Sequence, residues 1–173
     1  MKLESISAVA RALDGAGVRF LVVGGVAVNL HGYTRATQDL DLVVELSTSN
    51  VRAAMDALAG LGYRPQVPVD IHEFADPERR AEWIKDKHME VFSLVSDSHP
   101  ETTVDVFVTE PFAFDDEYQR SDRYEIEPGL ELRTVTPETL ITMKQTADRA
   151  RDRDDIEHLR WIIDERGEGE DDR

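Results

Sequence analysis

Apolar residues recur along the chain with two different periods, one typical of helices and one typical of strands. Residues 3–15 carry apolar side chains at helical spacing, and Gly15 and Gly17 end this predicted helix. Residues 18–23 are almost all apolar, as expected for a strand buried on both faces of a sheet. The same criteria predict further helices at 24–32, 47–61, 137–147 and 154–164 and further strands at 38–45, 88–95 and 102–108.

The segment before the last two helices is predicted to be a β-hairpin. Residues 124–126 and 130–135 have strand-like composition, and a Glu-Pro-Gly sequence at 127–129 separates them. Thr136 and Pro137 follow as the N-cap and first residue of a helix. Helices interleaved with strands, then a hairpin and two helices, predict an α/β (α+β) fold with a mixed sheet and a helical C-terminal end.

Length and composition favour one domain. A chain of 173 residues with 40% apolar residues can bury one core. We expect this domain to cover residues 1–166, with 136–166 as its helical part, and residues 167–173 to form a disordered acidic tail. The chain has no cysteine, which excludes disulfides, and no apolar run long enough to span a membrane, so we expect a soluble cytoplasmic protein.

The net charge restricts the class of ligand. Twenty lysines and arginines against 36 aspartates and glutamates give a net charge of −16. Binding to phosphate backbones depends on lysine and arginine, so this charge argues against nonspecific binding of nucleic acid. A local basic patch can still hold a nucleic-acid substrate, and bound divalent cations can offset part of the negative charge.

Gly24 and Gly25 lie where the first buried strand gives way to a helix. Residues without a Cβ let a ligand approach the backbone closely, and the free N–H groups of a helix N-terminus attract anions. The pair is therefore a candidate phosphate-binding turn. A tight strand-to-helix turn without a ligand is the alternative, and it is the commoner one for a Gly-Gly pair alone.

Asp39 and Asp41 are two residues apart on a predicted strand. Both carboxylates therefore point to one side, while Leu40 and Leu42 enter the core. Two like charges at this distance repel each other unless water or a cation lies between them. Mg²⁺ commonly takes one or two carboxylates plus substrate phosphates, so the pair is a candidate metal site. An ordinary solvent-facing strand is the alternative.

Asp105 is a third candidate carboxylate. It alternates with Val104 and Val106 on another predicted strand, so its side chain lies on the face opposite the valines. Taken alone, it is expected to be an exposed strand residue. On a strand beside Asp39 and Asp41, it would complete the acidic floor that two-metal phosphoryl chemistry requires.

The segment from Lys144 to Asp155 is rich in charge. Asp152 and Asp155 share a face on a helix, and such a segment is usually a solvated helix with surface salt bridges. The five histidines show no paired metal-binding spacing, and neither a nucleophile elbow nor a P-loop signature occurs. These observations argue against zinc, hydrolase and P-loop kinase chemistry.

Together, these segments resemble the ordered motifs of the minimal nucleotidyltransferases, a branch of the polymerase-beta-like superfamily, and are most similar to the AbiEii toxin-type members. Residues 24–42 (GGVAVNLHGYTRATQDLDL) resemble the first motif, and Asp105 lies on a strand similar to the one that carries the third carboxylate. Lys144 resembles the single lysine of the third motif. Residues 149–155 resemble the closing Arg-x-Lys-Asp-x-x-Asp element, with Arg151 in place of lysine.

The resemblance covers about residues 3–163 and implies a nucleotidyltransferase domain with a bent mixed sheet. It implies transfer of a nucleotidyl group from a nucleoside triphosphate to a hydroxyl, with Mg²⁺ or Mn²⁺ as cofactor. The metal-binding and catalytic carboxylates that it implies are Asp39, Asp41 and Asp105. The other residues that it implies are the catalytic Lys144 and the nucleotide-binding Gly24, Gly25, Arg35, Thr37, Asp152 and Asp155.

Some residues keep more than one interpretation. His31 either contacts the nucleotide or shapes the loop that follows it. Residues 79–87 either approach an acceptor or form a charged helix anchored to the core by Trp83, which is the commoner arrangement. His72 is a candidate for lining the same cleft, and the role of Arg151 is open.

Three functions are compatible with the resemblance. The first is Mg²⁺-dependent modification of RNA, such as tRNA, in a toxin-like role. The second is modification of a small molecule such as an aminoglycoside, which the net charge of −16 favours because an acidic cleft attracts cations. The third is a weakly catalytic nucleotide- or protein-binding module that pairs with a cognate partner protein. The fold alone does not choose among the three.

Overall fold

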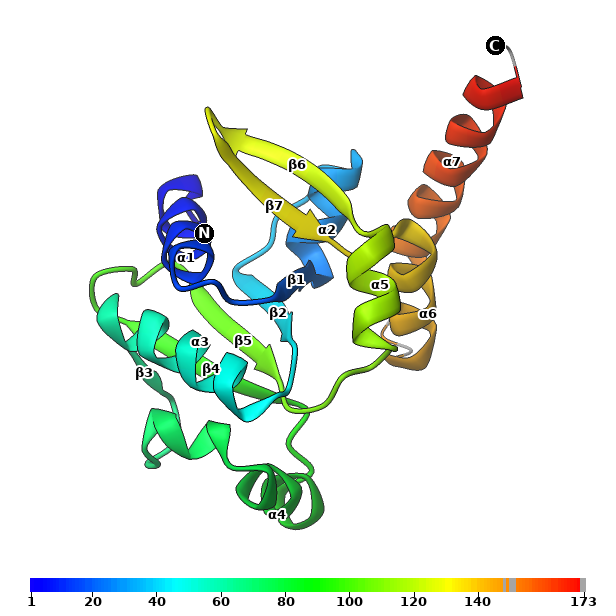
Figure 1. The fold of residues 1–173 in the computed structure, drawn as a ribbon. Helices are drawn as coiled ribbons and strands as arrows, with labels where there is room; N and C mark the ends of the chain where they lie inside the picture. The colour runs from blue at the N-terminus through cyan, green and yellow to red at the C-terminus, as the bar shows by residue number, and fades with distance from the viewer. Residues whose placement is uncertain (148, 150–151, 172–173) are drawn as a thin grey trace.

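The structure is a computed structural model that describes residues 1–147, 149 and 152–171. Within these residues, one sheet with the strand order β3-β4-β5-β2-β1-β7-β6 is flanked by helices (Figure 1). The strands are β1 (Phe20–Val23), β2 (Asp39–Val44), β3 (Tyr63–Pro65), β4 (Val91–Ser96), β5 (Thr103–Phe107), β6 (Asp122–Glu127) and β7 (Leu130–Thr134). The helices are α1 (Leu3–Gly15), α2 (Gly24–His31), α3 (Thr48–Gly60), η1 (Ile71–Ala75), α4 (Pro77–Lys87), α5 (Phe114–Arg120), α6 (Pro137–Ala147) and α7 (Asp152–Asp171).

The sheet is mixed, as predicted. Strand β1 pairs antiparallel with β2 and parallel with β7, while β2 pairs parallel with β5. The predicted hairpin is formed by β6 and β7, and Gly129 supplies the left-handed conformation that its turn needs. The predicted α/β (α+β) fold class is therefore confirmed.

The first third of the chain forms the elements that its apolar pattern predicts. Helix α1 has the predicted bounds and buries Val9, Ala10 and Leu13. Every residue of β1 is buried, as expected for a central strand with both faces covered. Each of the larger apolar side chains contributes about 1.5–3 kcal/mol when it is fully buried. This core holds the β1–α2 turn in place.

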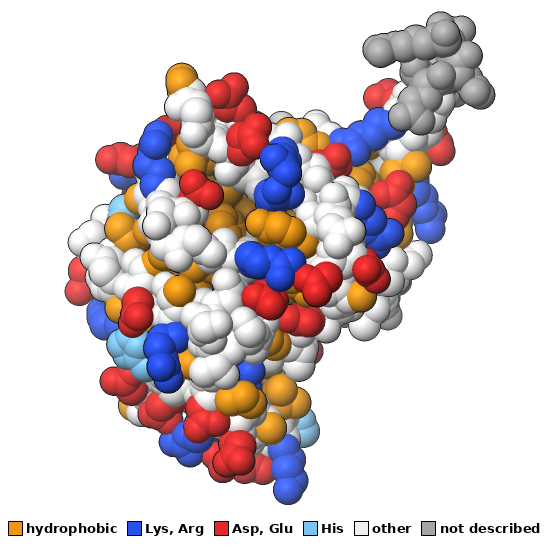
Figure 2. Space-filling model, viewed as in Figure 1, with side chains coloured by type: hydrophobic (Ala, Val, Ile, Leu, Met, Phe, Trp, Pro, Cys, Tyr) orange, Lys and Arg blue, Asp and Glu red, His pale blue; other side chains and the backbone are white. Residues whose placement is uncertain are grey.

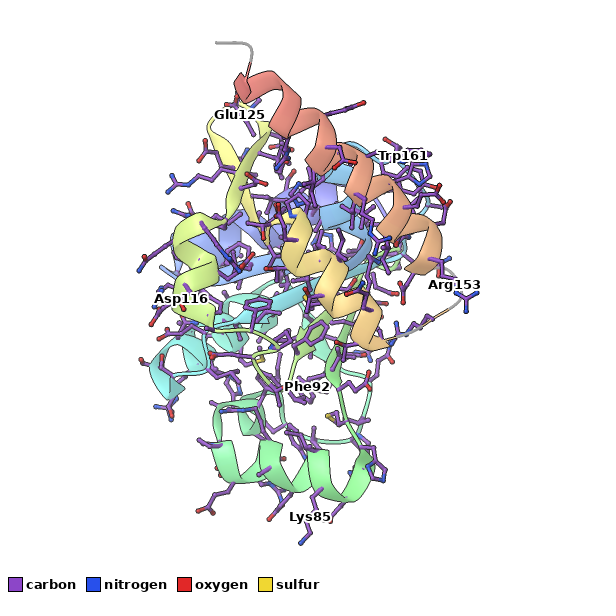
Figure 3. All side chains as sticks on the ribbon, turned by 90° about the vertical axis from the view of Figure 1, so that its right-hand side faces the viewer. Lys85, Phe92, Asp116, Glu125, Arg153 and Trp161 are labelled. Carbon is purple, nitrogen blue, oxygen red and sulfur yellow. The ribbon has the colours of Figure 1, made fainter. Side chains whose placement is uncertain are left out.

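The charged middle segment is helix α4, and Trp83 anchors it to the core. The Trp83 side chain is buried and stacks on Phe92 of β4 with ring centroids 5.3 Å apart. Figure 3 shows Phe92 inside the domain and Lys85 on the outer side of α4. Strand β4 begins at Val91 rather than at residue 88, because His88 adopts the left-handed conformation that ends α4.

Other elements differ from the prediction. Strand β3 and helix α5 are not predicted, because segments of three and seven residues are too short to show a period. Helix α7 extends to Asp171, through residues predicted to be a disordered tail, because adding residues to an existing helix costs little compared with starting one. No helix among the described residues is long and apolar enough to cross a membrane.

Candidate active site

The turn between β1 and α2 has the backbone geometry that only glycine adopts easily. Gly24 has φ +65°, and a Cβ on this residue would lie 2.0 Å from Oδ2 of Asp41. The carboxylate of Asp41 therefore packs directly against the start of α2. The Gly25 backbone N–H acts on this carboxylate and lowers its pKa.

Gly25 brings the loop after α2 against the same turn. A Cβ on Gly25 would lie 2.5 Å from Oγ1 of Thr37 and 3.2 Å from Nη1 of Arg35. The two loop residues predicted to bind nucleotide are thus adjacent to the predicted phosphate-binding turn. Asn29 fixes this loop, because its side-chain amide donates to the Arg35 carbonyl and accepts from the Arg35 N–H, both at 2.9 Å.

The three predicted carboxylates lie on neighbouring strands. Leu40 and Leu42 are buried, so Asp39 and Asp41 share the opposite face of β2, as predicted. The parallel register of β2 and β5 places Asp105 directly beside Asp41. The sequence predicts each strand and its faces, but only the pairing brings these two carboxylates together.

Burial and mutual repulsion make it unfavourable for these three carboxylates to be ionised together. The pKa of Asp41 is raised from 3.8 to about 7, first by burial and then by the charges of Asp105 and Asp39, which together outweigh the lowering effects of the Gly25 N–H and the Lys144 charge. Burial also raises the pKa of Asp105, while a hydrogen bond from Ser93 lowers it. Oδ1 of Asp105 is buried without a hydrogen-bond partner among the described residues. The negative charge of the cluster is therefore not fully compensated, and one oxygen of Asp105 has no donor among the described residues.

These properties fit a bound divalent cation. Three carboxylates are an oxygen-only donor set of the kind that Mg²⁺ and Mn²⁺ take, and a cation would satisfy the Asp105 oxygen. In the part of the chain that the structure describes, no three histidine, aspartate or glutamate side chains already lie close enough together to hold a metal ion. The metal-binding roles of Asp39, Asp41 and Asp105 stay predictions.

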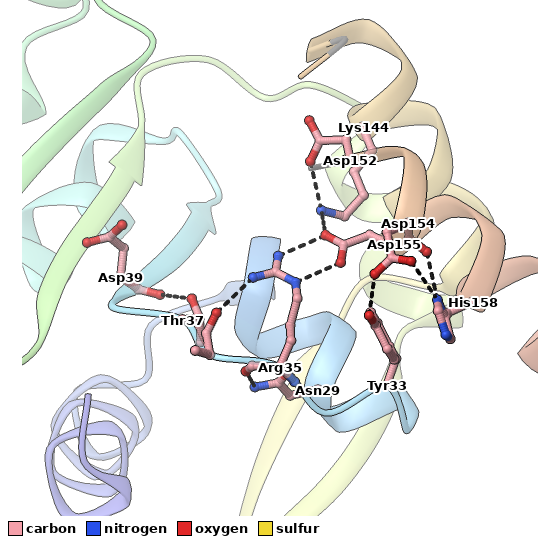
Figure 4. Close-up of polar contacts among 11 residues, drawn as sticks. Asn29, Tyr33, Arg35, Thr37, Asp39, Lys144, Asp152, Asp154, Asp155 and His158 are labelled. Carbon is pink, nitrogen blue, oxygen red and sulfur yellow. Dashed lines mark hydrogen bonds and ion pairs between the residues drawn. The ribbon is translucent and has the colours of Figure 1, made fainter. Parts of the chain in front are cut away.

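Lys144 belongs to a buried ionic network at the contact of α6 and α7. Its Nζ lies 3.2 Å from Oδ1 of Asp152 and 2.6 Å from Oδ2 of Asp155 (Figure 4). The Lys144 side chain is only 9% exposed. Asp152 and Asp155 do share a helix face, as predicted, but they form buried ion pairs instead of the solvated surface that the charge pattern favours.

Arg35 joins the same network from the loop after α2. Its Nε and Nη2 donate to Oδ1 and Oδ2 of Asp155 at 2.7 and 2.8 Å. Burial raises the pKa of Asp155, but the hydrogen bonds and charges of Arg35 and Lys144 outweigh burial and hold it below its usual value. Two cations and two carboxylates therefore neutralise each other beside the turn. The sequence gives no signal for this contact, because Arg35 and Asp155 are 120 residues apart.

Several residues with open roles lie outside this group. The ring of His31 is buried, with Nδ1 2.9 Å from the Tyr124 hydroxyl and Nε2 2.8 Å from the Val135 carbonyl oxygen. His31 thus links α2 to the hairpin and shapes the fold. Arg79 is in surface ion pairs with Glu73 and Glu82. Arg151 lies outside the described residues.

His72 lies in an exposed cluster that joins η1 to α3. Its Nδ1 and Nε2 are each 2.9 Å from a carboxylate oxygen, of Asp70 and Asp56 respectively, and both hydrogen bonds raise the pKa of His72. Because this pKa is raised in the folded state, the stabilisation is complete below pH 6.5 and is lost as the pH rises through the folded pKa.

We expect His72→Gln to lower the unfolding temperature by about 1–2 °C at pH 5.5 and by less at pH 8, because an exposed ion pair contributes little. Thermal unfolding followed by circular dichroism at both pH values would measure this. The exposed His88 is the matched control, because it takes part in none of the described ion pairs, and His88→Gln should change the unfolding temperature at pH 5.5 by less than His72→Gln does. An equal loss at both pH values for His72→Gln would contradict the ionic role.

The chain is similar to known proteins both in sequence and in fold. The family model described as "Nucleotidyl transferase AbiEii toxin, Type IV TA system" matches residues 8–159. The lincosamide antibiotic adenylyltransferase LnuA, solved with lincomycin bound, superposes with a TM-score of 0.57 at 13% identity, covering 86% of this chain and 90% of that one. The antibiotic-resistance factor ANT(2'')-Ia superposes with a TM-score of 0.53 at 14% identity, covering 98% and 94%. These two likenesses show a shared fold. No curated protein matches the sequence.

Proposed function

The chain belongs to the AbiEii family of nucleotidyl transferases, and from this membership and the site we propose that it transfers a nucleoside monophosphate from a nucleoside triphosphate to a hydroxyl of RNA, with Mg²⁺ as cofactor. The observation that carries the proposal is the pairing of Asp41 with Asp105 next to Gly24. This arrangement sets uncompensated carboxylates beside a helix N-terminus, so that a cation and a phosphate can bind side by side.

In the proposed reaction, the acceptor oxygen attacks the α-phosphorus while the bond from that phosphorus to the pyrophosphate oxygen breaks. The free N–H groups at the start of α2 bind the triphosphate at the Gly24–Gly25 turn. Asp39, Asp41 and Asp105 would hold Mg²⁺, which when bound offsets charge on the phosphates and polarises their oxygens. Asp105 accepts the proton of the acceptor hydroxyl. Lys144 and Arg35 stabilise the charge on the departing pyrophosphate.

We choose RNA as the acceptor because the family is described as a toxin of a toxin–antitoxin system. The proposal also includes a cognate partner protein that controls the activity. The charge distribution favours a restricted RNA contact. Acidic and basic side chains are interspersed over the face shown in Figure 2, without one continuous basic surface. A protein of net charge −16 would therefore hold an RNA end at the site and not a long phosphate backbone.

A small-molecule acceptor is the second candidate, and the net charge favours it. A cationic acceptor is attracted to an acidic cleft, whereas a phosphate backbone is repelled. The fold shared with two antibiotic-resistance proteins does not by itself identify an acceptor.

Incubation with Mg²⁺, each of four α-labelled nucleoside triphosphates and total RNA would test the proposal. We expect label to enter an RNA band with the wild-type protein and not with a variant carrying Asp39→Asn and Asp41→Asn, because that variant lacks two of the three carboxylates. A double variant with Asp86→Asn and Asp97→Asn removes two exposed carboxylates and should keep full transfer. Transfer by the Asp39 and Asp41 variant at the wild-type rate would refute the metal site. Label on an added aminoglycoside but not on RNA would favour the second candidate.

A further inference from the structure

We propose that Asp155 is a positioning residue that holds Arg35 and Lys144 toward the triphosphate and does not itself contact the nucleotide. The inference rests on the proposed function, since it concerns how the same site binds the donor. It assigns Asp155 a role different from the direct nucleotide contact that the sequence motif implies.

Asp155 has no free surface for a ribose or a base. Its side chain is only 1% exposed. Oδ1 accepts from Nε of Arg35, and Oδ2 accepts from Nη2 of Arg35 and from Nζ of Lys144. Both oxygens are thus occupied by protein donors, so a nucleotide would have to displace a buried ion pair in order to reach this carboxylate.

Arg35 is held by one edge of its guanidinium and presents the other to the turn. The Nε and Nη2 edge forms the two-point contact with Asp155, which fixes the plane of the group. Nη1 donates to the Ala36 carbonyl at 3.1 Å and lies 3.2 Å from the position that a Cβ on Gly25 would take. Nη1 carries two N–H groups and the described contacts use one, so a second donor remains beside the Gly24–Gly25 turn, where we place the phosphates.

Like Arg35, Lys144 has a donor that the described contacts do not use. An ammonium group has three donors, and the described contacts use two of them, to Asp152 and Asp155. The Asp155 carboxylate that accepts from Lys144 also accepts from Arg35, whose Nη1 lies at the Gly25 turn. Asp155 is the only contact shared by Arg35 and Lys144 among the described ion pairs.

The first turn of α7 therefore fixes two separate elements relative to each other. Asp155 ties the loop after α2 to α6 through Arg35 and Lys144, and Asp154 holds the Tyr33 hydroxyl of the same loop (Figure 4). Tyr33 also stacks on His158. Asp164, farther along α7, is exposed and takes part in none of the described ion pairs, so it offers a control on the same helix.

Removing the Asp155 carboxylate should change phosphate affinity in opposite directions, depending on whether Asp155 positions the two cations or only contributes its charge. Removing a negative charge beside an anion site strengthens anion binding if charge is the only effect. Losing the group that orients two cations weakens it, as the loss of an orienting partner commonly does by about 10- to 100-fold at metal sites. A direct contact to ribose or base would change only the affinity for a complete nucleotide.

Isothermal titration calorimetry with Mg²⁺ and either ATP or inorganic tripolyphosphate separates these cases. Tripolyphosphate has neither base nor ribose, so it reports on the phosphate site alone. We expect Asp155→Asn to weaken both ligands by the same factor, about tenfold or more. The control Asp164→Asn makes the same charge change and should bind tripolyphosphate within about twofold of the wild type.

Three outcomes with Asp155→Asn would overturn the inference. Tighter tripolyphosphate binding by Asp155→Asn would show that Asp155 only competes with phosphate, and a loss confined to ATP would show a nucleoside contact. Unchanged binding of both would show no role. If Asp155→Asn does not fold, the Asp155→Glu variant tests the inference instead, because it keeps the charge but displaces the carboxylate. A wild-type affinity of Asp155→Glu for tripolyphosphate would then refute positioning. A wild-type protein that binds neither ligand refutes the proposed function as well, whereas a failure confined to the variants leaves that function intact.

Discussion

An Asp41→Asn variant is expected to unfold at a higher temperature than the wild type, although it loses the proposed transfer activity. The wild-type carboxylate is buried beside two other carboxylates, and its pKa rises from 3.8 to about 7. Asparagine removes that charge and keeps a side-chain oxygen that can accept a hydrogen bond from the Gly25 N–H. A shift of one pKa unit corresponds to about 1.4 kcal/mol, so after allowance for relaxation we expect a gain of roughly 1–3 kcal/mol.

The stability that Asp41→Asn gains over the wild type is expected to increase with pH. Because the pKa of Asp41 is raised in the folded state, the wild-type carboxyl is protonated at low pH and carries no penalty below 3.8. The penalty grows between pH 3.8 and about 7 and is constant above that, so the difference between variant and wild type should be larger at pH 8 than at pH 5.

Thermal unfolding in a chelating buffer, followed by circular dichroism at both pH values, would measure this difference. Asp97→Asn is the matched control, because its side chain is 92% exposed and its replacement should leave the unfolding temperature almost unchanged. Adding Mg²⁺ should raise the unfolding temperature of the wild type and have less effect on Asp41→Asn, since a ligand of the folded state stabilises it. A variant that is less stable than the wild type at pH 8 would contradict the unfavourable charge at this position.

A Gly24→Ala variant is expected to be destabilised by roughly 2–5 kcal/mol and to lose transfer activity. An alanine at φ +65° costs about 1–2 kcal/mol, because a Cβ is unfavourable in the left-handed region. The new Cβ would also lie 2.0 Å from Oδ2 of Asp41, so the carboxylate must move, which adds a strain of about 1–3 kcal/mol. Displacing Asp41 removes it from the cluster that we propose to bind Mg²⁺.

Gly15→Ala provides the control for this change. Gly15 lies in α1 without a positive φ, and a Cβ on it would meet no atom within 4 Å. Alanine there should be neutral or stabilise by up to about 1 kcal/mol, because it restricts the unfolded chain. Urea unfolding of both variants would test the contrast. A Gly24→Ala variant as stable as the wild type would contradict the close contact between the turn and Asp41.

The sequence by itself determined the local elements and the faces of most strands. Helix α1 and the strand, turn and helix around Gly24 and Gly25 follow from periodicity and glycine alone, because the spacing of apolar residues decides which side of an element is buried. The alternation of Asp39 and Asp41 with buried leucines follows in the same way. The motif resemblance then identified the family over nearly the same residues as the family model matches.

Only the tertiary structure decided which of these side chains meet. The parallel register of β2 and β5 sets Asp105 beside Asp41, and a register shifted by one residue would have put the two on opposite faces. Likewise, the packing of α7 on α6 and on the loop after α2 converts a segment that reads as a solvated charged helix into the buried group of Arg35, Lys144 and Asp155. These pairings depend on contacts between residues that are distant in the chain, whereas periodicity reports only on near neighbours.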